Sequence, residues 1–536
     1  MASAVIFSCF LFFLLCTSHA ANHQHANFLR CFLEETGGSS SSPSIIYTPN
    51  ATSFATLYRS SIQNLRFLSS GAETPSFLIV PSVAHDAQAA VLCGRRHGVR
   101  LRVRSGGHDY EGLSYVSFSR THGPFAVLDL SGLRSIDVDA EARTAWVGAG
   151  ATVGEVYYHV AAASPTAAFP VGVCTTVGVG GLFSGGGLGS LQRKYGVSAD
   201  NIVDAELVNA DGELLTRETM GEDLFWAIRG GGAANFGVVV AYKLRLVPVP
   251  PRLTLFSVSR TLEEGATRLL HSWQSIAPRV ADDLWLRTLA LAVGEAPVNR
   301  TIQVIFQGLF LGPRHAMLAA INKSFPELGV RAEDCNELSW VETALALDGH
   351  PLNDPSVLLD RRPVYSNSSF KGKSDFVRKP ISQKAWEGLW EVMMEGEEEP
   401  MAMALEPWGG RLWDIEDDAI AFPHRKGNLY NIQYLMRWFE TQEAEAETER
   451  HLRWMRRLYD YMAPHVSSNP RAAYLNYKDI DLGSSTEEGR TSYMEASAWG
   501  RRYFLHNFDK LAKVKARVDP ENYFWNEQGI PPFAAW

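Results

Sequence analysis

The feature that most constrains this sequence is the stretch from Gly172 to Gly189, which is dense in glycine and holds a single cysteine, Cys174. Glycine in regular structure costs about 0.5–1 kcal/mol relative to alanine, because it has more backbone freedom to lose. A backbone pressed against a flat ligand would justify that cost. The stretch matches neither the dinucleotide-binding fingerprint of Rossmann folds nor the phosphate loop that ends in Gly-Lys-Ser/Thr.

A second glycine motif, Arg104-Ser-Gly-Gly-His-Asp-Tyr110, directly follows a predicted strand. Consecutive glycines let several backbone N–H groups converge on one point, which makes a concave site for an anion such as a pyrophosphate. A simple hairpin turn would need only one or two glycines, without the flanking serine and histidine. The two motifs together predict a site for a flat ligand that carries an anionic group.

Bulk properties place the chain among globular proteins. At 536 residues it is too long for one typical core, so two or more substructures are expected. Hydrophobic residues make up 46% and charged residues 20%, as in soluble globular domains. The formal net charge of -9 argues against nucleic acid and against an anionic membrane surface as partners. No cysteine and histidine spacing is typical of zinc, so no metal is predicted.

Hydrophobic periodicity predicts alternating strands and helices. The strand over 100–104 alternates polar and apolar residues, which predicts one buried face. The helix over 83–97 is expected to pack through Ala87, Ala90, Val91 and Gly94. Further strands are predicted over 77–80, 125–130, 145–148 and 244–251, and a helix over 443–462 with an apolar stripe of Trp454, Met455, Leu458 and Met462.

The N-terminus predicts a signal peptide over residues 1–20. Val5 to Leu15 is almost wholly apolar, and Ser18-His-Ala20 places small residues at the cleavage positions, although the basic first region is missing. A membrane anchor is the alternative, but the run is shorter than the about 20 residues that a bilayer requires. No later segment is long and apolar enough to span. The chain is therefore expected to be secreted, to the extracellular space, cell wall or vacuole.

The remaining cysteines and the glycosylation acceptors agree with that route. An oxidising compartment permits a disulfide, and Cys31–Cys93 is the candidate pair. The acceptor motifs for N-glycosylation begin at Asn50, Asn299, Asn322 and Asn367.

The motif that starts at Arg104 and continues as Glu-Gly-Leu-Ser to Tyr115 resembles the berberine bridge enzyme-like family of plant FAD-linked oxidases. That family has the vanillyl-alcohol oxidase type of flavoprotein fold. The resemblance covers nearly the whole chain after residue 20 and keeps the family's order, through Gly172-Val-Cys174, Lys194-Tyr-Gly196, Ala199-Asp-Asn201, the Asp223 to Gly232 segment, Phe422-Pro-His-Arg425, Leu475 to Asp479, Asp519 to Asn522 and Asn526-Glu-Gln528.

The resemblance implies an α+β fold with a two-part FAD-binding domain. Residues 45–250 would form its first part and residues 475–536 would complete it. A substrate-binding domain over 251–474, made of antiparallel sheet plus helices, would be inserted between the two parts.

The resemblance also implies that FAD is bicovalent. His108 corresponds to the histidine that bonds the flavin 8α-methyl, and Cys174 to the cysteine that bonds flavin C6. A secreted enzyme diluted outside the cell would lose a dissociable cofactor, and two attachments should raise the flavin's potential. From the residues alone, Cys174 could instead be an inert buried thiol or be paired with Cys335.

For catalysis, the resemblance implies that Tyr477 is the base and that Tyr110 and Gln433 keep the family pattern. Family members that oxidise alcohols carry a second tyrosine and often a lysine or acid nearby, where this chain has Leu188 and Asn431. A phenol is a poor base at neutral pH unless neighbours stabilise the phenolate. Tyr474, in the same segment, could be a structural tyrosine and is not assigned a catalytic role. Further cofactor contacts are expected from Ser105, Gly106, Gly107, Val177, Gly178, Gly181, Gly237 and Asn526.

The resemblance also implies that Val177 stands at the position that, in family members, decides whether dioxygen reaches the flavin, and a small residue there resembles the oxidases. Leu182 replaces a histidine that is common in the family, which should alter flavin electronics. The implied function is hydride transfer from a small organic substrate, a carbohydrate or alcohol, to FAD, with dioxygen as the acceptor and H2O2 as a product. The alternatives are an FAD-linked dehydrogenase with another acceptor, or a catalytically weakened flavin-containing surface or defence protein. The sequence makes no prediction of oligomeric state.

Overall fold

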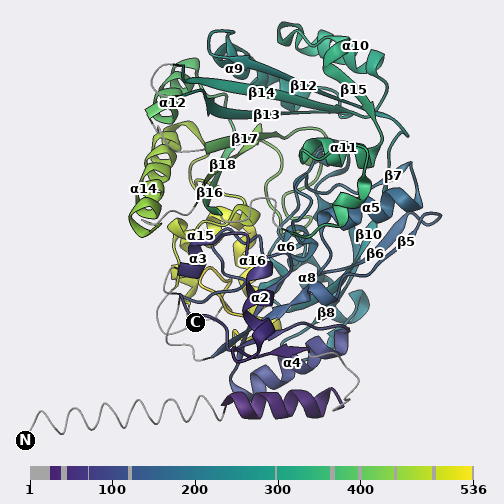
Figure 1. The fold of residues 1–536 in the computed structure, drawn as a ribbon, viewed down its shortest axis with the longest axis vertical. Coiled ribbons are helices and arrows are strands. Elements are labelled where there is room, and N and C mark those ends of the chain that lie inside the picture. The colour runs from purple at the N-terminus through teal and green to yellow at the C-terminus, as the bar shows by residue number, and fades with distance from the viewer. Residues whose placement is uncertain are drawn as a thin grey trace, which may run out of the picture.

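The computed structural model describes residues 24–37, 45–69, 72–118, 124–295, 299–362, 368–395, 401–439, 444–485 and 491–533. The predicted signal peptide and the acceptor Asn367 lie outside these ranges. The chain folds into mixed helices and sheets, an α+β architecture as predicted (Figure 1). In this part of the chain, no helix combines the length and apolar character needed to cross a membrane.

The first sheet is small and carries the first glycine motif at its edge. Its strand order is β1-β2-β4-β3, with β2, β4 and β3 parallel and β1 antiparallel to β2. The predicted strands are confirmed as β2 (Phe77–Ile79), β3 (Arg100–Arg104) and β4 (Phe125–Asp129), and the structure adds the short β1 (Ile46–Tyr47), which was not predicted. Two helices, α2 (Thr52–Ser60) and α3 (Arg66–Ser69), lie between β1 and β2 in the chain.

The prediction that β3 has one buried face is wrong, because two of its arginines are buried too. Arg102 is 5% exposed and Arg104 is fully buried. Arg102 pairs with Glu527 at 2.9 Å, and Arg104 pairs with Asp129. Buried charges require such partners, and Glu527, far along the chain, could not be assigned to β3 from local periodicity.

Helix α4 (Ala84–His97) confirms the predicted helix and its packed face, since Ala87, Ala90, Val91 and Gly94 are all buried. Cys93 on α4 forms a disulfide with Cys31, which lies in the helical segment 24–35. The predicted pair is thus confirmed. The acceptor residues Asn50, Asn299 and Asn322 are all exposed, as glycosylation requires.

A second, antiparallel sheet has the order β5-β6-β10-β8-β9. Its middle strand β10 pairs with β6 on one side and β8 on the other. A short ladder joins β7 (Ala167–Ala168) to β11 (Val247–Pro248), so the predicted strand over 244–251 is split in two. The sheet comprises β5 (Ile136–Asp139), β6 (Thr144–Gly148), β8 (Ile202–Val208), β9 (Leu214–Leu215) and β10 (Val238–Arg245), with helices α5 (Val153–Ala163), α6 (Val179–Ser184), α7 (Gln192–Tyr195) and α8 (Arg217–Ala227) beside it in the chain.

The third and largest sheet is antiparallel throughout, with the order β15-β12-β14-β13-β17-β18-β16. All of its strands come from one continuous part of the chain. They are β12 (Leu253–Thr261), β13 (Leu284–Val293), β14 (Thr301–Phe310), β15 (Cys335–Leu338), β16 (Ser368–Val377), β17 (Met401–Pro407) and β18 (Tyr430–Phe439).

The large sheet separates two hydrophobic cores. Its outer face packs against four helices, α9 (Ala266–Ile276), α10 (Arg314–Ser324), α12 (Gln383–Glu395) and α14 (Ala444–Met462) (Figure 1). The predicted stripe of α14 is confirmed, with Met455, Leu458 and Met462 buried and Trp454 half-buried. Its inner face packs against the two smaller sheets. Helices α11 (Trp340–Leu347) and α13 (Arg411–Asp414) contribute side chains to the same core.

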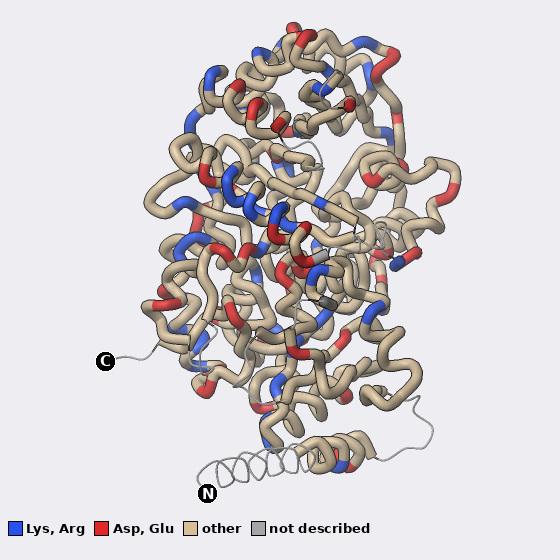
Figure 2. Tube along the Cα trace, turned by 60° about the vertical axis from the view of Figure 1, so that its left-hand side comes forward, with Lys and Arg blue, Asp and Glu red and all other residues tan. Residues whose placement is uncertain are grey.

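The C-terminal segment returns to the inner core. Helices α15 (Tyr493–Phe504) and α16 (Asn507–Val518) contribute Trp499, Phe508 and Leu511 to the same core as the first two sheets. Arg100 of β3 donates to the carbonyls of Asn522 and Tyr523 at 2.9 and 3.2 Å. Acidic and basic residues are interspersed along the whole trace, with oppositely charged segments adjacent in its middle (Figure 2).

Candidate active site

The two glycine motifs meet just after the end of β3 and just before the start of α6. A Cβ on Gly106 would lie 2.3 Å from the backbone N of Gly178, and a Cβ on Gly178 would lie 2.2 Å from the N of Gly106. The hydroxyl of Ser105 donates to the carbonyl of Ala149 at 2.7 Å and accepts from the N–H of Gly180 at 3.3 Å. The two backbones therefore pack in a way that no side chain at either glycine would allow.

Backbone donors of the first glycine motif lie next to this contact. The backbone N–H groups of Gly106, Gly107 and His108 donate no hydrogen bond to any residue that the structure describes. Gly107 has a φ of +70°, and a Cβ there would lie 1.6 Å from the carbonyl O of Ser61. Gly181 is exposed, and a Cβ on it would meet no atom within 4 Å. Neighbouring free N–H donors suit a pyrophosphate, and the bare glycine leaves room for a flat ring, so this site fits FAD.

His108 and Cys174 converge on one hydroxyl group. His108 Nε2 lies 3.0 Å from Thr176 Oγ1, and Cys174 Sγ lies 4.0 Å from the same atom. Cys174 is half-buried and free, and Cys335 is a separate free thiol on β15, so the two are not paired. The predicted pair of attachment residues thus lies within reach of one ligand.

The surroundings set the protonation of both groups. Burial, together with the charge of Arg437, lowers the pKa of His108 to about 4, so its imidazole is neutral and nucleophilic at neutral pH. Burial and the charge of Asp348 raise the pKa of the Cys174 thiol to about 11. Asp348 also anchors the loop, because its Oδ2 accepts from the N–H of Thr175 at 3.0 Å and from its hydroxyl at 2.5 Å.

A cluster of tyrosines forms the opposite wall. Tyr477, in the short 3-10 helix Leu475–Tyr477, stacks on Tyr110 with ring centroids 5.6 Å apart and planes at 17°. The side-chain N–H of Gln433 donates to the Tyr110 hydroxyl. Burial raises the pKa of both phenols, with Tyr477 well above 10. Both are therefore neutral phenols near pH 7.

Tyr474 stands edge-on to Tyr477, with ring centroids 4.9 Å apart. Its hydroxyl accepts from the backbone N–H of Gly187 at 2.9 Å and from the side chain of Asn476 at 2.8 Å. These bonds tie it to the second glycine motif, which agrees with the predicted structural role. Leu188, the residue after Gly187, is buried.

Asn431 lies on β18 two residues before Gln433, so both side chains are on the same face of the sheet. Its amide N–H donates to the carbonyl of Asp375 at 2.9 Å. Its Oδ1 is buried and has no partner within the described ranges. No described contact joins Asn431 to Tyr110 or Tyr477.

Periodicity and motifs did not predict an acid in this wall. Glu406 on β17 is the register partner of Asn431. Its carboxylate accepts from Trp285 Nε1 at 3.2 Å and from Arg287 at 3.4 Å, and burial raises its pKa. Its charge also helps to raise the pKa of Tyr477. The only sequence signal was a lone acid at the end of an otherwise apolar strand.

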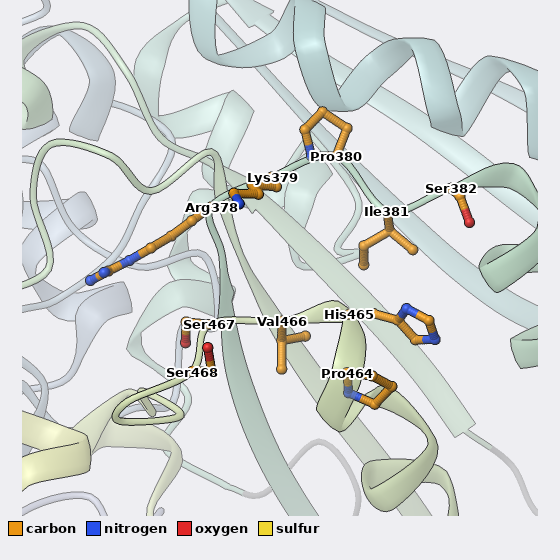
Figure 3. Close-up of a pocket in the computed structure, with 10 residues that line it drawn as sticks. All are labelled: Arg378, Lys379, Pro380, Ile381, Ser382, Pro464, His465, Val466, Ser467 and Ser468. Atoms are coloured by element: carbon orange, nitrogen blue, oxygen red, sulfur yellow. The ribbon is translucent and has the colours of Figure 1, made fainter.

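The other predicted cofactor residues are divided between two places. Val177 and Gly178 lie in the loop of Cys174, where the N–H of Val177 donates to the carbonyl of Cys174 at 3.4 Å. Gly237 instead packs into the core, since a Cβ there would lie 2.6 Å from the carbonyl O of Val208. Asn526 lies 3.4 Å from the side chain of Asn235. The groove drawn in Figure 3 is lined by residues 378–382 and 464–468 and contains no predicted site residue.

A two-part fold around glycine loops that fit FAD defines this protein as an FAD-binding flavoprotein. A family model described as "FAD binding domain" matches residues 75–217, and one described as "Berberine and berberine like" matches residues 473–531. A tetrahydroberberine oxidase from Berberis wilsoniae is 49% identical over 527 residues, with 97% of each chain covered. The chain belongs to the berberine bridge enzyme-like family of FAD-linked oxidoreductases.

Solved structures of relatives agree over nearly the whole chain. The structure of berberine bridge enzyme-like 28 from Arabidopsis thaliana has a TM-score of 0.88 at 43% identity and covers 95% of this chain and all of that one. The grass pollen allergen Phl p 4, wild type, is described as a glucose dehydrogenase, with a TM-score of 0.87 at 42% identity and the same coverage. Its variant with valine in place of an isoleucine, equally similar, is described as a glucose oxidase.

Proposed function

We propose that this protein is a secreted oxidase that holds FAD through His108 and Cys174 and oxidises a small organic substrate, a carbohydrate or alcohol in the first instance. The observation that carries the proposal is the convergence of these two side chains on Thr176, beside an open glycine surface. The predicted route through an oxidising compartment is supported by the Cys31–Cys93 disulfide.

We assign the FAD to residues 45–250 and 475–536, and the substrate to the domain over 251–474. The glycine motifs and His108 lie in the first region. The seven-stranded sheet lies within residues 251–474 and carries Gln433, Asn431 and Glu406. Ser105, Gly106, Gly107, Gly178 and Gly181 would line the cofactor, while Gly237 and Asn526 would support it from the core.

The chemistry that FAD would supply at this site is acceptance of a hydride from the donor and return of two electrons, together with two protons, to dioxygen, which gives H2O2. Tyr477 would take the donor's hydroxyl proton, and Tyr110 and Gln433 would hold the donor against it. The stacking of Tyr477 on Tyr110 and the bond from Gln433 support these roles. Val177, next to Gly178, would leave the path of dioxygen open, which is consistent with the oxidase behaviour of the valine variant of Phl p 4.

A second donor class, a tertiary amine, is favoured by the weak support of Tyr477. Its hydroxyl has no hydrogen-bond partner within the described residues, and burial keeps it a neutral phenol. Loss of a hydride from the carbon next to an amine nitrogen gives an iminium ion directly, so no hydroxyl proton has to be removed. The tetrahydroberberine oxidases among the relatives act on a donor of this kind by name.

The test is a comparison of D-glucose, a panel of aromatic allylic alcohols and tetrahydroberberine, with H2O2 release measured in air. Peroxide from any of them establishes an oxidase and identifies the donor class. Bleaching of the flavin without peroxide, together with reduction of a quinone dye, would establish a dehydrogenase instead. Failure of every donor to bleach the flavin under nitrogen would contradict the proposed enzyme.

A further inference from the structure

Strand β16 runs past both site tyrosines at the edge of the large sheet. All ten of its residues are buried, and among the residues that the structure describes it pairs with one other strand, β18. The segment Phe370-Lys-Gly-Lys373 lies near its start, and we call this segment the tyrosine seat. Its side chains alternate between two surroundings, as in any strand.

The glycine of the seat makes room for Tyr110. A Cβ on Gly372 would lie 2.4 Å from Cδ2 and from Cε2 of the Tyr110 ring. Phe370, on the same side, meets that ring edge-on with centroids 5.2 Å apart. The side chain of Asn64 joins the two backbones, because its amide donates to the carbonyls of Tyr110 at 3.1 Å and Phe370 at 3.0 Å. Tyr110 is therefore seated directly on the strand.

The two lysines of the seat contact acids that follow the two tyrosines in the chain. Lys371 Nζ contacts the carboxylate of Glu111, the residue after Tyr110, and lies 2.7 Å from Oδ1 of Asp479. Lys373 Nζ lies 2.7 Å from Oδ2 of the same Asp479. Asp479 is two residues beyond Tyr477. Both lysines are 1% exposed.

These ion pairs connect the two tyrosine segments to each other. The N–H of Ile480 donates to Oε1 of Glu111 at 3.3 Å, so the segment after Tyr477 also contacts the segment after Tyr110 directly. Oppositely charged groups buried together hold their geometry strongly, because a buried charge without its partner is unfavourable. Asp481 joins the network because its Oδ2 lies 2.7 Å from Lys373 Nζ. At the outer edge of the network, Asp481 also pairs with Arg456 at 2.8 Å, and the Arg456 side chain is 46% exposed.

We propose that the tyrosine seat sets the relative position of Tyr110 and Tyr477, with Lys371 and Gly372 as positioning residues. Gly372 fixes the plane of the Tyr110 ring, and Lys371 draws Glu111 and Asp479 to one point, which fixes the distance between the two rings. These contacts alone support the fixed position of the two rings. The effect of that position on catalysis rests on the proposed role of Tyr477.

Two variants of the holoenzyme test the seat, with Arg456→Met as the matched control. Gly372→Ala keeps every charge, and Gly372 has no positive φ, so alanine suits its backbone. Lys371→Met removes the central cation. The positions of the rings are measured by 19F NMR of protein labelled with 3-fluorotyrosine, with Tyr110→Phe and Tyr477→Phe used to assign the two resonances. Both test variants should shift both resonances, and Arg456→Met should shift neither.

The rate of anaerobic flavin reduction is measured on the same variants, with tetrahydroberberine or glucose, whichever bleaches the wild-type flavin. Because small misplacements of reacting groups cost up to about 100-fold, we expect the rate constant at saturating donor to fall about 10- to 100-fold in Gly372→Ala, with the wild-type melting temperature nearly kept. Lys371→Met is expected to fall likewise and to melt at a lower temperature.

The outcomes separate this inference from the proposed function. Unchanged resonances in Gly372→Ala would overturn the seat, whatever the activity. If Gly372→Ala shifts the resonances but keeps the wild-type reduction rate, while Tyr477→Phe is slow, the seat holds the rings but does not matter for catalysis. If Tyr477→Phe reduces its flavin at the wild-type rate, the proposed role of Tyr477 fails instead, and the fixed position of the two rings is judged by the resonances.

Discussion

Replacing Tyr477 by phenylalanine should slow flavin reduction far more than it weakens donor binding. The change removes one hydroxyl and leaves the ring that stacks on Tyr110 at 5.6 Å and meets Tyr474 at 4.9 Å. General base catalysis typically contributes about 10²–10⁴-fold. We therefore expect the anaerobic reduction rate constant for an alcohol donor to fall by a factor in that range, with the donor concentration at half-saturation nearly unchanged.

The pH dependence should show which form of Tyr477 acts. Burial, with the charge of Glu406 among the further causes, raises the pKa of this phenol well above its ordinary value near 10. At pH 7 less than about one molecule in a thousand then carries the phenolate. Only the phenolate form of Tyr477 can accept the donor's proton, and below the pKa the fraction of phenolate rises about tenfold for each pH unit. The reduction rate of the wild type should therefore rise about tenfold for each pH unit toward alkaline pH. Leu188→Tyr, which restores the second tyrosine expected in alcohol-oxidising family members, should stabilise the phenolate and shift that profile to lower pH.

Tyr474→Phe is the control, because its hydroxyl is already bonded to the backbone of Gly187 and to Asn476. Loss of that hydroxyl should lower thermal stability while the slope of the pH profile stays. Stopped-flow absorbance at the flavin band under nitrogen measures all three variants. If Tyr477→Phe reduces its flavin as fast as the wild type with an alcohol donor, the base lies elsewhere and the reasoning is refuted.

Three further predictions concern the cofactor loops and the disulfide. Val177→Leu should slow reoxidation of the reduced flavin by dioxygen without changing its reduction by the donor, and equal reoxidation traces after rapid mixing would remove the basis for an oxidase. Gly178→Ala should lower the bound FAD, read from the ratio of flavin to protein absorbance, because its Cβ would lie 2.2 Å from the N of Gly106; full FAD loading would show that the loops need not touch. Removing the disulfide in Cys31→Ala/Cys93→Ala should lower the free energy of unfolding by about 4 kcal/mol for residues 62 apart in the chain, and an unchanged guanidinium midpoint would count against that contribution.

Local sequence patterns predicted much of the fold. The glycine motifs located the two loops, and periodicity located α4, with its packed face, and α14, with its stripe. These features depend on residues a few positions apart, which a pattern can register. The packing of Gly106 against Gly178 could not be predicted in the same way, because it joins two loops through the tertiary fold.

The missed features involve partners that are far apart in the chain. Burial of Arg102 depends on Glu527, and the place of Glu406 depends on its register with Asn431. From sequence alone, an acid at the end of a strand is expected to face solvent. Its burial becomes evident only when the neighbouring strands are known. The alternating pattern of β3 was therefore misinterpreted.

The central claim is that His108 and Cys174 both bond the flavin, and mass spectrometry of the digested holoenzyme tests it most directly. Protein precipitated with acid and washed should stay yellow, and trypsin should release one flavin-bearing species that joins the peptide of His108 to the peptide of Cys174. The variants His108→Ala and Cys174→Ala should each keep the flavin on the other peptide alone. Quantitative recovery of free FAD in the acid supernatant of the wild type would contradict the account.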